Sequence, residues 1–301
     1  MKMLFCSDGR KQADNAVRFG ALIAAACQAE TSILGVAERT SEQEPLLQSL
    51  RREQLILKEY HLDAELISKA GRPVREIAKR ARESDYDMVV IGAEHNIARG
   101  KGWTSARAYK IIESVEPPVL VVIGERLDLR RILLCSSGRP SEDKAVEHAG
   151  EIARSGNAVV DLFHVMDEPP AIYANLIRMK EDADRLLSSR SKLGRALRRH
   201  KELLEEFGVF GEFLLRHGLV VPETLKELQR NEYDMVVTGS SPAADRLRTY
   251  VMGNVTREIV NRADLPVLVL RTEPTQIMAR IGDFVTHLFR RSRVTSEAAT
   301  N

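Results

Sequence analysis

The residues best suited to chemistry are glycines and hydroxyl side chains that follow a repeated apolar segment. Tyr86–Gly92 (YDMVVIG) returns as Tyr233–Gly239 (YDMVVTG), and each copy is typical of a buried strand that stops at its glycine. We expect a polar loop from Ser240 to Val255 after the second copy, with a helix that opens at Gly253. A strand, a loop and a helix N-terminus in this order present backbone N–H groups to a phosphate. The candidate residues for anion binding are Gly239, Ser240, Ser241, Arg246, Gly253, Asn254 and Val255.

Catalytic groups are harder to find in this sequence. Asp8 is the one acid that we can place at a strand end facing a ligand, and His95 is a lone loop histidine. Cys6 and Cys135 end matching strands, which inherited packing explains better than two nucleophiles. No Gly-x-x-x-x-Gly-Lys-Ser/Thr loop is present, and no Ser-His-Asp or Cys-His set can be placed. We therefore interpret the chain as non-enzymatic, without catalytic residues.

Composition narrows the class of protein further. The length of 301 residues suggests about two domains, and 45 basic against 43 acidic residues argue against a nucleic-acid partner. The three cysteines lack metal-ligand spacing, which predicts reduced thiols and no metal site. The first residues turn polar too soon for a signal peptide, and no apolar run approaches the roughly 20 residues that span a bilayer. These features predict a cytoplasmic protein.

The elements that must position the candidate residues alternate between strand and helix. Apolar strands are predicted at 2–6, 31–36, 61–68, 86–92 and 119–123, and helices at 13–26, 46–60, 73–82 and 105–114. This alternation is the signature of a parallel sheet with helices on both faces.

After a charged linker at 124–130 the pattern restarts, and Ile132–Arg139 echoes Met3–Arg10. The offset grows from 129 residues at the first strand to 147 at the fourth, so we expect an insertion at about 167–208, folded as one long helix or a helical hairpin. A solvated helix face explains its basic cluster better than a nucleic-acid or membrane contact does, because acidic residues follow at once. The cluster comprises Arg195, Arg198, Arg199, His200 and Lys201.

The tail at 273–301 has no counterpart in the first half. Apolar residues recur at helical spacing from Ile277 to Phe289, which predicts an amphipathic helix followed by disorder from Ser292. We expect this helix to dock on its own domain or on a partner, either a second copy in a homodimer or another protein. Contact with a membrane surface is the alternative.

Each half resembles the universal stress protein family in a set of short matches. They are Cys-Ser-Asp-Gly and Cys-Ser-Ser-Gly after the first strands, Ala-Gly-Arg-Pro at 70–73, Arg-His-Gly at 216–218, the repeated Tyr-Asp-Met-Val-Val, and Pro-Val-Leu-Val at both fifth strands. The resemblance implies an α/β fold of two tandem Rossmann-like domains of the adenine nucleotide alpha hydrolase type, at 1–125 and 128–272. Each would be a five-stranded parallel sheet with helices on both faces. The two would pair through their fifth strands as a pseudo-dimer within the chain.

ATP-binding members of this family carry Gly-x-x-Gly, nine further residues and Gly-Ser or Gly-Thr, with an acid after the first strand. The first half keeps Asp8 and Gly92, but His95 replaces the second glycine and Ser105 stands at the closing pair. The second half keeps Gly239 and Gly253, but Ser137 replaces the acid, Pro242 the second glycine and Asn254 the hydroxyl residue. The resemblance thus implies partly degenerate sites in both halves.

The cofactor implied is ATP or another adenine nucleotide, with magnesium if it binds. Besides the residues named above, the candidates include Val36 and Val165 at the ends of the second strands. The second half is the better candidate, because Arg246 or Arg248 could supply charge and Asn254 could donate through its amide. Two hypotheses remain: a stress-response module with degenerate sites that acts through protein–protein contacts, or an adenine-nucleotide sensor that uses the second-half loop.

Overall fold

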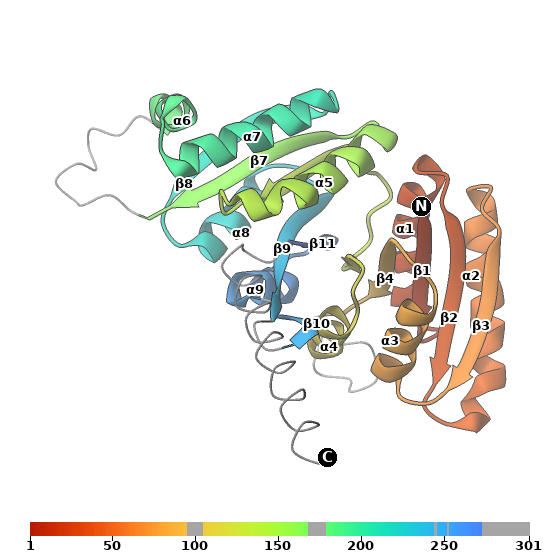
Figure 1. The fold of residues 1–301 in the computed structure, drawn as a ribbon. Coiled ribbons are helices and arrows are strands. Elements are labelled where there is room, and N and C mark those ends of the chain that lie inside the picture. The colour runs from red at the N-terminus through yellow and green to blue at the C-terminus, as the bar shows by residue number, and fades with distance from the viewer. Residues whose placement is uncertain (95–104, 168–178, 244–245, 252, 273–301) are drawn as a thin grey trace, which may run out of the picture.

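The computed structural model describes residues 1–94, 105–167, 179–243, 246–251 and 253–272 (Figure 1). Strand and helix alternate in the first half as predicted. Its elements are β1 (Lys2–Ser7), α1 (Lys11–Ala26), β2 (Glu30–Ala37), α2 (Gln43–Glu59), β3 (Ala64–Ala70), α3 (Pro73–Glu83), β4 (Met88–Gly92), α4 (Ser105–Ser114) and β5 (Val119–Val122). The third strand begins at Ala64 and not at His61, because His61 adopts a φ of 58° in the turn that ends α2. The predicted tail helix at 273–301 lies outside the described residues.

The second half repeats this order with additions. Its elements are β6 (Arg131–Cys135), α5 (Asp143–Ser155), β7 (Val159–Met166), α6 (Met179–Ser188), α7 (Lys192–Glu206), β8 (Phe210–His217), α8 (Val220–Arg230), β9 (Met235–Ala243), β10 (Arg246–Val251), α9 (Asn254–Arg262) and β11 (Val267–Arg271). Two of these elements, α6 and β10, have no first-half counterpart among the described residues.

The prediction that the strand stops at Gly239 was wrong. β9 continues to Ala243. Its last residues pair antiparallel with β10, and Ser240 before them lies in register with Arg271 of β11. The backbone groups beyond Gly239 therefore have ladder partners, so the polar residues that follow do not end the strand. The β-branched and aromatic residues Thr249, Tyr250 and Val251 were the available signal for β10.

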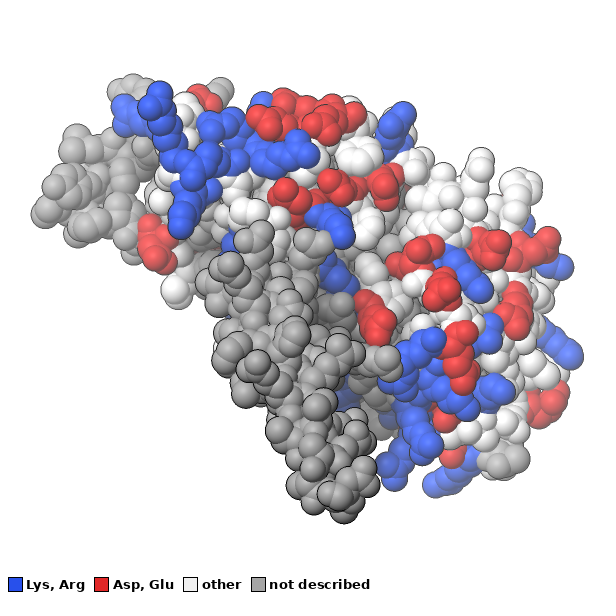
Figure 2. Space-filling view, in the orientation of Figure 1, with Lys and Arg blue, Asp and Glu red and all other residues white. Residues whose placement is uncertain are grey.

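Helices α6 and α7 pack against each other, and α7 contacts β7 and β8 as α2 contacts β2 and β3. Figure 2 shows Lys and Arg gathered over this pair of helices. Part of the positive charge is paired within α7, since Arg199 lies 3.2 Å from Glu206 and Lys201 lies 2.6 Å from Glu205. His200 does not belong to the basic face, because it is fully buried.

One sheet runs through both halves. The strand order is β3-β2-β1-β4-β5-β11-β9-β6-β7-β8, parallel within each half and antiparallel where β5 meets β11. Val121, Leu120 and Val119 pair with Val267, Leu268 and Val269, so a pseudo-two-fold axis passes beside Leu120 and Leu268. The expected α/β fold and the pairing of the halves through their fifth strands are confirmed.

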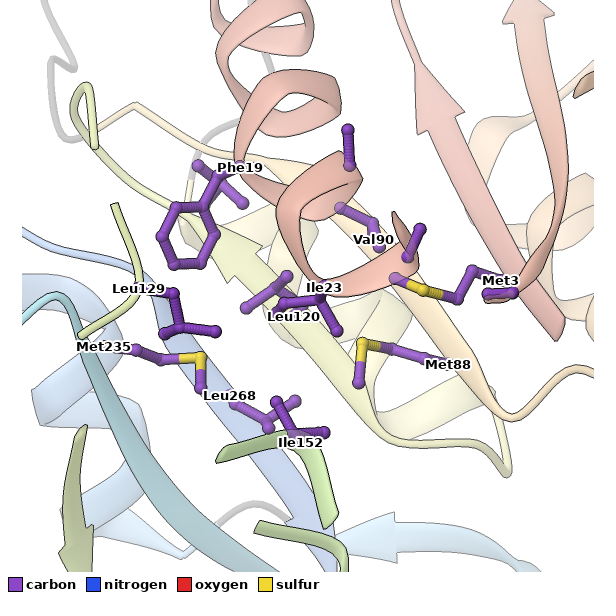
Figure 3. Close-up of a cluster of buried hydrophobic side chains, with 14 of the residues drawn as sticks. Met3, Phe19, Ile23, Met88, Val90, Leu120, Leu129, Ile152, Met235 and Leu268 are labelled. Atoms are coloured by element: carbon purple, nitrogen blue, oxygen red, sulfur yellow. The ribbon is translucent and has the colours of Figure 1, made fainter. Parts of the chain in front are cut away.

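Two apolar cores cover the two faces of this sheet. One contains residues of α1, α2, α5 and α7, and the other contains residues of α3, α4 and α9. Figure 3 shows the first core where the halves meet, with Ile23 of α1 and Ile152 of α5 over Leu120 and Leu268. The core is thus continuous across the junction, and burial of apolar area holds the halves together. Among the described residues, no helix combines the length and apolar character needed to cross a membrane.

Candidate functional site

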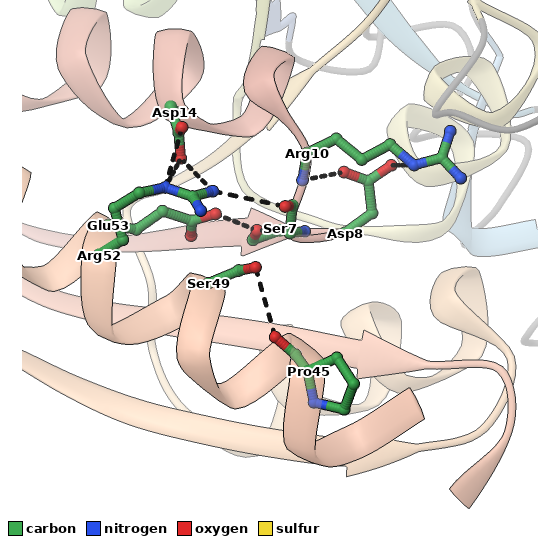
Figure 4. Close-up of polar contacts among 9 residues, drawn as sticks. Ser7, Asp8, Arg10, Asp14, Pro45, Ser49, Arg52 and Glu53 are labelled. Carbon is green, nitrogen blue, oxygen red and sulfur yellow. Dashed lines mark hydrogen bonds and ion pairs between the residues drawn. The ribbon is translucent and has the colours of Figure 1, made fainter. Parts of the chain in front are cut away.

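The end of β1 forms a tight turn that holds Asp8 at the carboxyl edge of the sheet (Figure 4). The N–H of Gly9 donates to Ser7 Oγ at 2.9 Å, and Gly9 has a φ of 76°, which favours glycine. The second half repeats this turn, since the Gly138 N–H donates to Ser136 Oγ at 2.9 Å with a φ of 71°. The repeated Cys-Ser-x-Gly motif is therefore explained by turn geometry.

A cleft of about 600 Å³ opens beside this turn, at the carboxyl ends of β1 and β2. Two predicted site residues, Asp8 and Val36, line the cleft. The strand order reverses between β1 and β4, so the Asp8 end of the cleft borders the reversal at which open α/β sheets bind ligands. Further lining residues are Arg10, Glu38, Arg39, Glu42, Ser49 and Arg107.

Charges of both signs surround the cleft. Asp8 accepts from the Arg10 N–H at 3.2 Å and lies 3.8 Å from Arg10 Nε, while Arg107 of α4 lies 2.8 Å from Glu38 Oε1. The Asp8 side chain is 18% exposed, and burial raises the pKa of its carboxyl while the Arg10 N–H and charge oppose this. The cleft thus combines arginines suited to an anion with a carboxyl suited to a hydrogen-bond donor.

A buried carboxyl lies behind the turn. Ser7 Oγ donates to Glu53 Oε1 at 2.5 Å, and Glu53 Oε2 has no hydrogen-bond partner among the described residues. Burial raises the pKa of Glu53 to about 8. Sequence analysis missed this group, although Glu53 shares the apolar face of α2 with Leu50 and Leu57.

The other first-half candidates lie near the cleft or outside the described part of the chain. Gly92 ends β4 and lines a small pocket together with Asp8. A Cβ on Gly92 would stand 2.6 Å from the carbonyl oxygen of Gln12, so close packing against α1 already requires glycine there. Ser105 begins α4. His95 lies outside the described residues.

The second-half candidates are dispersed. Ser240 is buried, and its Oγ accepts from Arg271 Nη1 at 2.8 Å, while the Gly239 carbonyl accepts from Thr256 Oγ1 at 2.9 Å. Ser241 belongs to β9 and Arg246 to β10. Gly253, Asn254 and Val255 are exposed at the N-terminus of α9.

An acid that sequence analysis missed stands next to Ser137. The Ser137 N–H donates to both oxygens of Glu142, at 3.1 and 3.3 Å, and the Ser137 hydroxyl also donates to Glu142. Glu142 therefore brings a carboxylate to the place that Asp8 holds in the first half. Val165 lies near the end of β7, the position of Val36 in β2.

A buried Ser-His-Asp group lies behind Ser137, although sequence analysis could not place such a set. Ser136 Oγ lies 2.9 Å from His200 Nδ1, and His200 Nε2 lies 3.2 Å from Asp143 Oδ1. Ser136 is only 8% exposed, and its Oγ also donates to Glu142 at 3.0 Å. The group therefore ties β6, α5 and α7 together. His200 takes the place that Glu53 has in the first half.

A model of one protein family matches both halves of the chain, at residues 1–122 and 128–271, and its description is the universal stress protein family. The chain belongs to the universal stress protein family. The repeated strand order and the repeated turn after β1 and β6 are therefore features of two universal stress protein domains in tandem.

Individual relatives are distant. The chain is 26% identical over 148 residues to Universal stress protein MJ0531 of Methanocaldococcus jannaschii, which covers 49% of this chain and 85% of that protein. It is 25% identical over 162 residues to Stress response protein NhaX of Bacillus subtilis, which covers 47% of this chain and 97% of that protein. The crystal structure of a universal stress protein from Archaeoglobus fulgidus superposes with a TM-score of 0.61 and 14% identity, covering 90% of this chain and 96% of that one. That likeness shows the shared fold.

Proposed function

We propose that this universal stress protein acts in the stress response as a non-catalytic module that binds an adenine nucleotide in its first half. The observation that carries the proposal is the cleft of about 600 Å³ beside Asp8, at the edge of the sheet where such folds bind ligands. Its volume lies within the roughly 300–1,000 Å³ of small-molecule sites.

The charges around the cleft suit the two ends of a nucleotide. The Asp8 side chain is largely buried at the end of β1, and its carboxylate can accept a hydrogen bond from the adenosine end of the nucleotide. Arg10, Arg39 and Arg107 line the same cleft and can attract phosphate. This proposal differs from the preference for the second half that the sequence alone supported.

A second candidate function is protein–protein interaction without nucleotide. The observation that favours it is the hydrogen bond from Arg271 to the Ser240 hydroxyl, which is buried near the junction of the halves. A hydroxyl used in this way is not available to phosphate, so the second domain would serve as a scaffold. The nucleotide hypothesis is nevertheless the better supported, because it accounts for the open cleft in the first domain.

Calorimetric titration with ATP, ADP and AMP, with and without magnesium, tests the proposal. We expect saturable binding that Asp8→Asn weakens by about tenfold, the effect of losing roughly 1.4 kcal/mol. The matched control is Glu142→Gln, which removes the corresponding carboxylate of the second half and should leave the affinity within about twofold of wild type.

The outcomes separate the alternatives. A loss caused by Glu142→Gln or Gly253→Val, with Asp8→Asn unaffected, would place the nucleotide in the second half and overturn the proposal. No heat with any nucleotide would leave the interaction hypothesis. Release of inorganic phosphate at a rate above that of free ATP would contradict the non-catalytic role.

A further inference from the structure

A second cleft, of about 590 Å³, lies where the two halves meet. It is formed by the amino ends of β4 and β5, by α5, and by the end of β11, so it lies away from the carboxyl edge that carries Asp8. We call it the junction cleft. Its lining residues include Cys27, Met88, Pro118, His148, Ile152 and Leu270.

The internal repeat explains why this cleft is open. The two halves align with an offset of 129 residues from β1 and β6 through α1 and α5. The backbone hydrogen bonds at the ends of the two helices show the same offset. The Cys27 N–H donates to the Ile23 carbonyl at 2.9 Å, and the Gly156 N–H donates to the Ile152 carbonyl at 2.9 Å. His148 therefore takes the position of Phe19, and Glu151 that of Leu22.

The place that the pseudo-two-fold axis relates to the junction cleft is filled by apolar side chains. Phe19 is fully buried there, and Leu129 of the linker belongs to the same apolar core (Figure 3). At the junction cleft the equivalent helix face carries the exposed side chains of His148 and Glu151. Two positions that are apolar on α1 are thus polar on α5, and the space that a phenylalanine would fill is open.

The lining defines the chemistry of an occupant. The inner wall is apolar, because Met88, Ile152 and Leu270 are buried or nearly so, and Pro118 lies beside them. The outer wall carries the carboxylates of Asp87 and Glu151, and Met1 also lines the cleft, with its amino group acting on Cys27. The two carboxylates outnumber this one positive charge. Asp87 Oδ2 already accepts from the Lys2 N–H at 2.7 Å, which fixes its carboxylate at this place. An apolar body can cover the inner wall, and a cationic head can meet the carboxylates.

We propose that the junction cleft binds a small amphiphile with an apolar body and an amine head. A molecule in this place contacts both halves, since Met88 and Pro118 belong to one and Ile152 and Leu270 to the other. Its binding therefore stabilises the junction between them.

The test uses three probes of equal length, hexylamine, hexanol and hexanoate, on the full chain. Cys27 serves as a reporter, because its thiol lines the cleft. Burial raises the pKa of all three thiols, that of Cys135 to about 12 and that of Cys6 further. Alkylation of Cys27 by iodoacetamide is followed by peptide mass spectrometry, and the Met88 methyl signal by NMR. We expect hexylamine to slow the alkylation and shift the methyl signal at lower concentrations than hexanol, and hexanoate to act most weakly.

Two substitutions at one position supply the matched comparison. His148→Phe restores the residue that α1 has at this place and should fill the cleft, weakening hexylamine binding by about tenfold or more. His148→Ala keeps the cleft open and should leave the affinity within about threefold of wild type. Circular dichroism of both variants checks that they fold as wild type does.

Three results would overturn the proposal. They are no protection of Cys27 by any probe, equal binding by the Phe and Ala variants, or tighter binding of hexanoate than of hexylamine. The inference does not depend on the nucleotide site: Asp8→Asn should leave hexylamine binding unchanged, and His148→Phe should leave nucleotide binding unchanged.

Discussion

Arg271 of β11 donates from Nη1 to Ser240 Oγ of β9 at 2.8 Å, and the same guanidinium reaches into the other half of the molecule. Its Nη2 donates to the carbonyls of Ile112 and Val115, both at 2.8 Å, and its Nε to that of Glu116 at 3.0 Å. These carbonyls lie at and just after the C-terminal end of α4, where a cation is favourable. One side chain therefore satisfies helix-end acceptors across the junction of the two domains.

Arg271→Ala should destabilise the whole chain, because it leaves several carbonyls at the end of α4 without their donor. We expect a loss of about 2–4 kcal/mol in the free energy of unfolding, measured by urea denaturation. The matched control is Arg262→Ala, whose exposed guanidinium lies 3.9 Å from Glu258 and should contribute at most about 0.5 kcal/mol. Equal effects of the two substitutions would show that the contacts of Arg271 do not stabilise the junction.

Glu53 should make the protein less stable as the pH rises. Burial raises its pKa from 4.5 to about 8, so the folded state holds a proton that the unfolded state has lost. The stability that this group contributes is therefore full below about pH 4.5 and declines until about pH 8, by about 1.4 kcal/mol per pH unit at most. Glu53→Gln should flatten this decline, as measured by urea denaturation between pH 5 and pH 8. The exposed control Glu59→Gln should keep the wild-type slope, and a Glu53→Gln profile parallel to wild type would contradict the assignment.

His200 should make the protein less stable as the pH falls below about 7. Burial lowers its pKa, against the charges of Glu142 and Asp143, so the folded state prefers the neutral ring. The stability that this group contributes is present above its ordinary pKa, near 6.5, and is lost as the pH falls through the lowered value. His200→Gln should reduce the loss of stability between pH 7 and pH 5. The exposed control His61→Asn should behave as wild type, and a steeper loss in His200→Gln would show that the buried ring is protonated.

Two glycines of the predicted phosphate sites should respond differently to alanine. A Cβ at Gly92 would stand 2.6 Å from a backbone carbonyl of α1, so Gly92→Ala should cost about 1–3 kcal/mol by overpacking. Gly253 has a φ of −57°, and no heavy atom of the described residues lies within 4 Å of the Cβ position. Gly253→Ala should therefore change the unfolding free energy by about 0.5 kcal/mol or less. The melting temperatures of the two variants provide the comparison, and a tolerated Gly92→Ala would mean that α1 moves readily away from β4.

The sequence by itself determined the repeated α/β architecture and the residues of each turn after β1 and β6. These features depend on local periodicity and on glycine at positive φ, and both can be recognised from neighbouring residues without knowledge of tertiary contacts. It also indicated the fifth strands as the junction, through the resemblance carried by the Pro-Val-Leu-Val segments. The strand formed by Arg246–Val251 was indicated only by the β-forming residues Thr249, Tyr250 and Val251, and the glycine pattern favoured a loop there.

Only the tertiary structure decided which polar groups remain available to bind a ligand. Ser240 looked like a phosphate ligand, yet its partner Arg271 is 31 residues away and reaches α4 of the other domain. His200 was grouped with the surface charges of its neighbours and Glu53 was missed, whereas helix packing buries both side chains. The open junction beside His148 arises where α5 meets the amino ends of β4 and β5 and the end of β11, which are distant in the sequence. Availability, burial and open space depend on contacts between distant segments, and no local pattern records them.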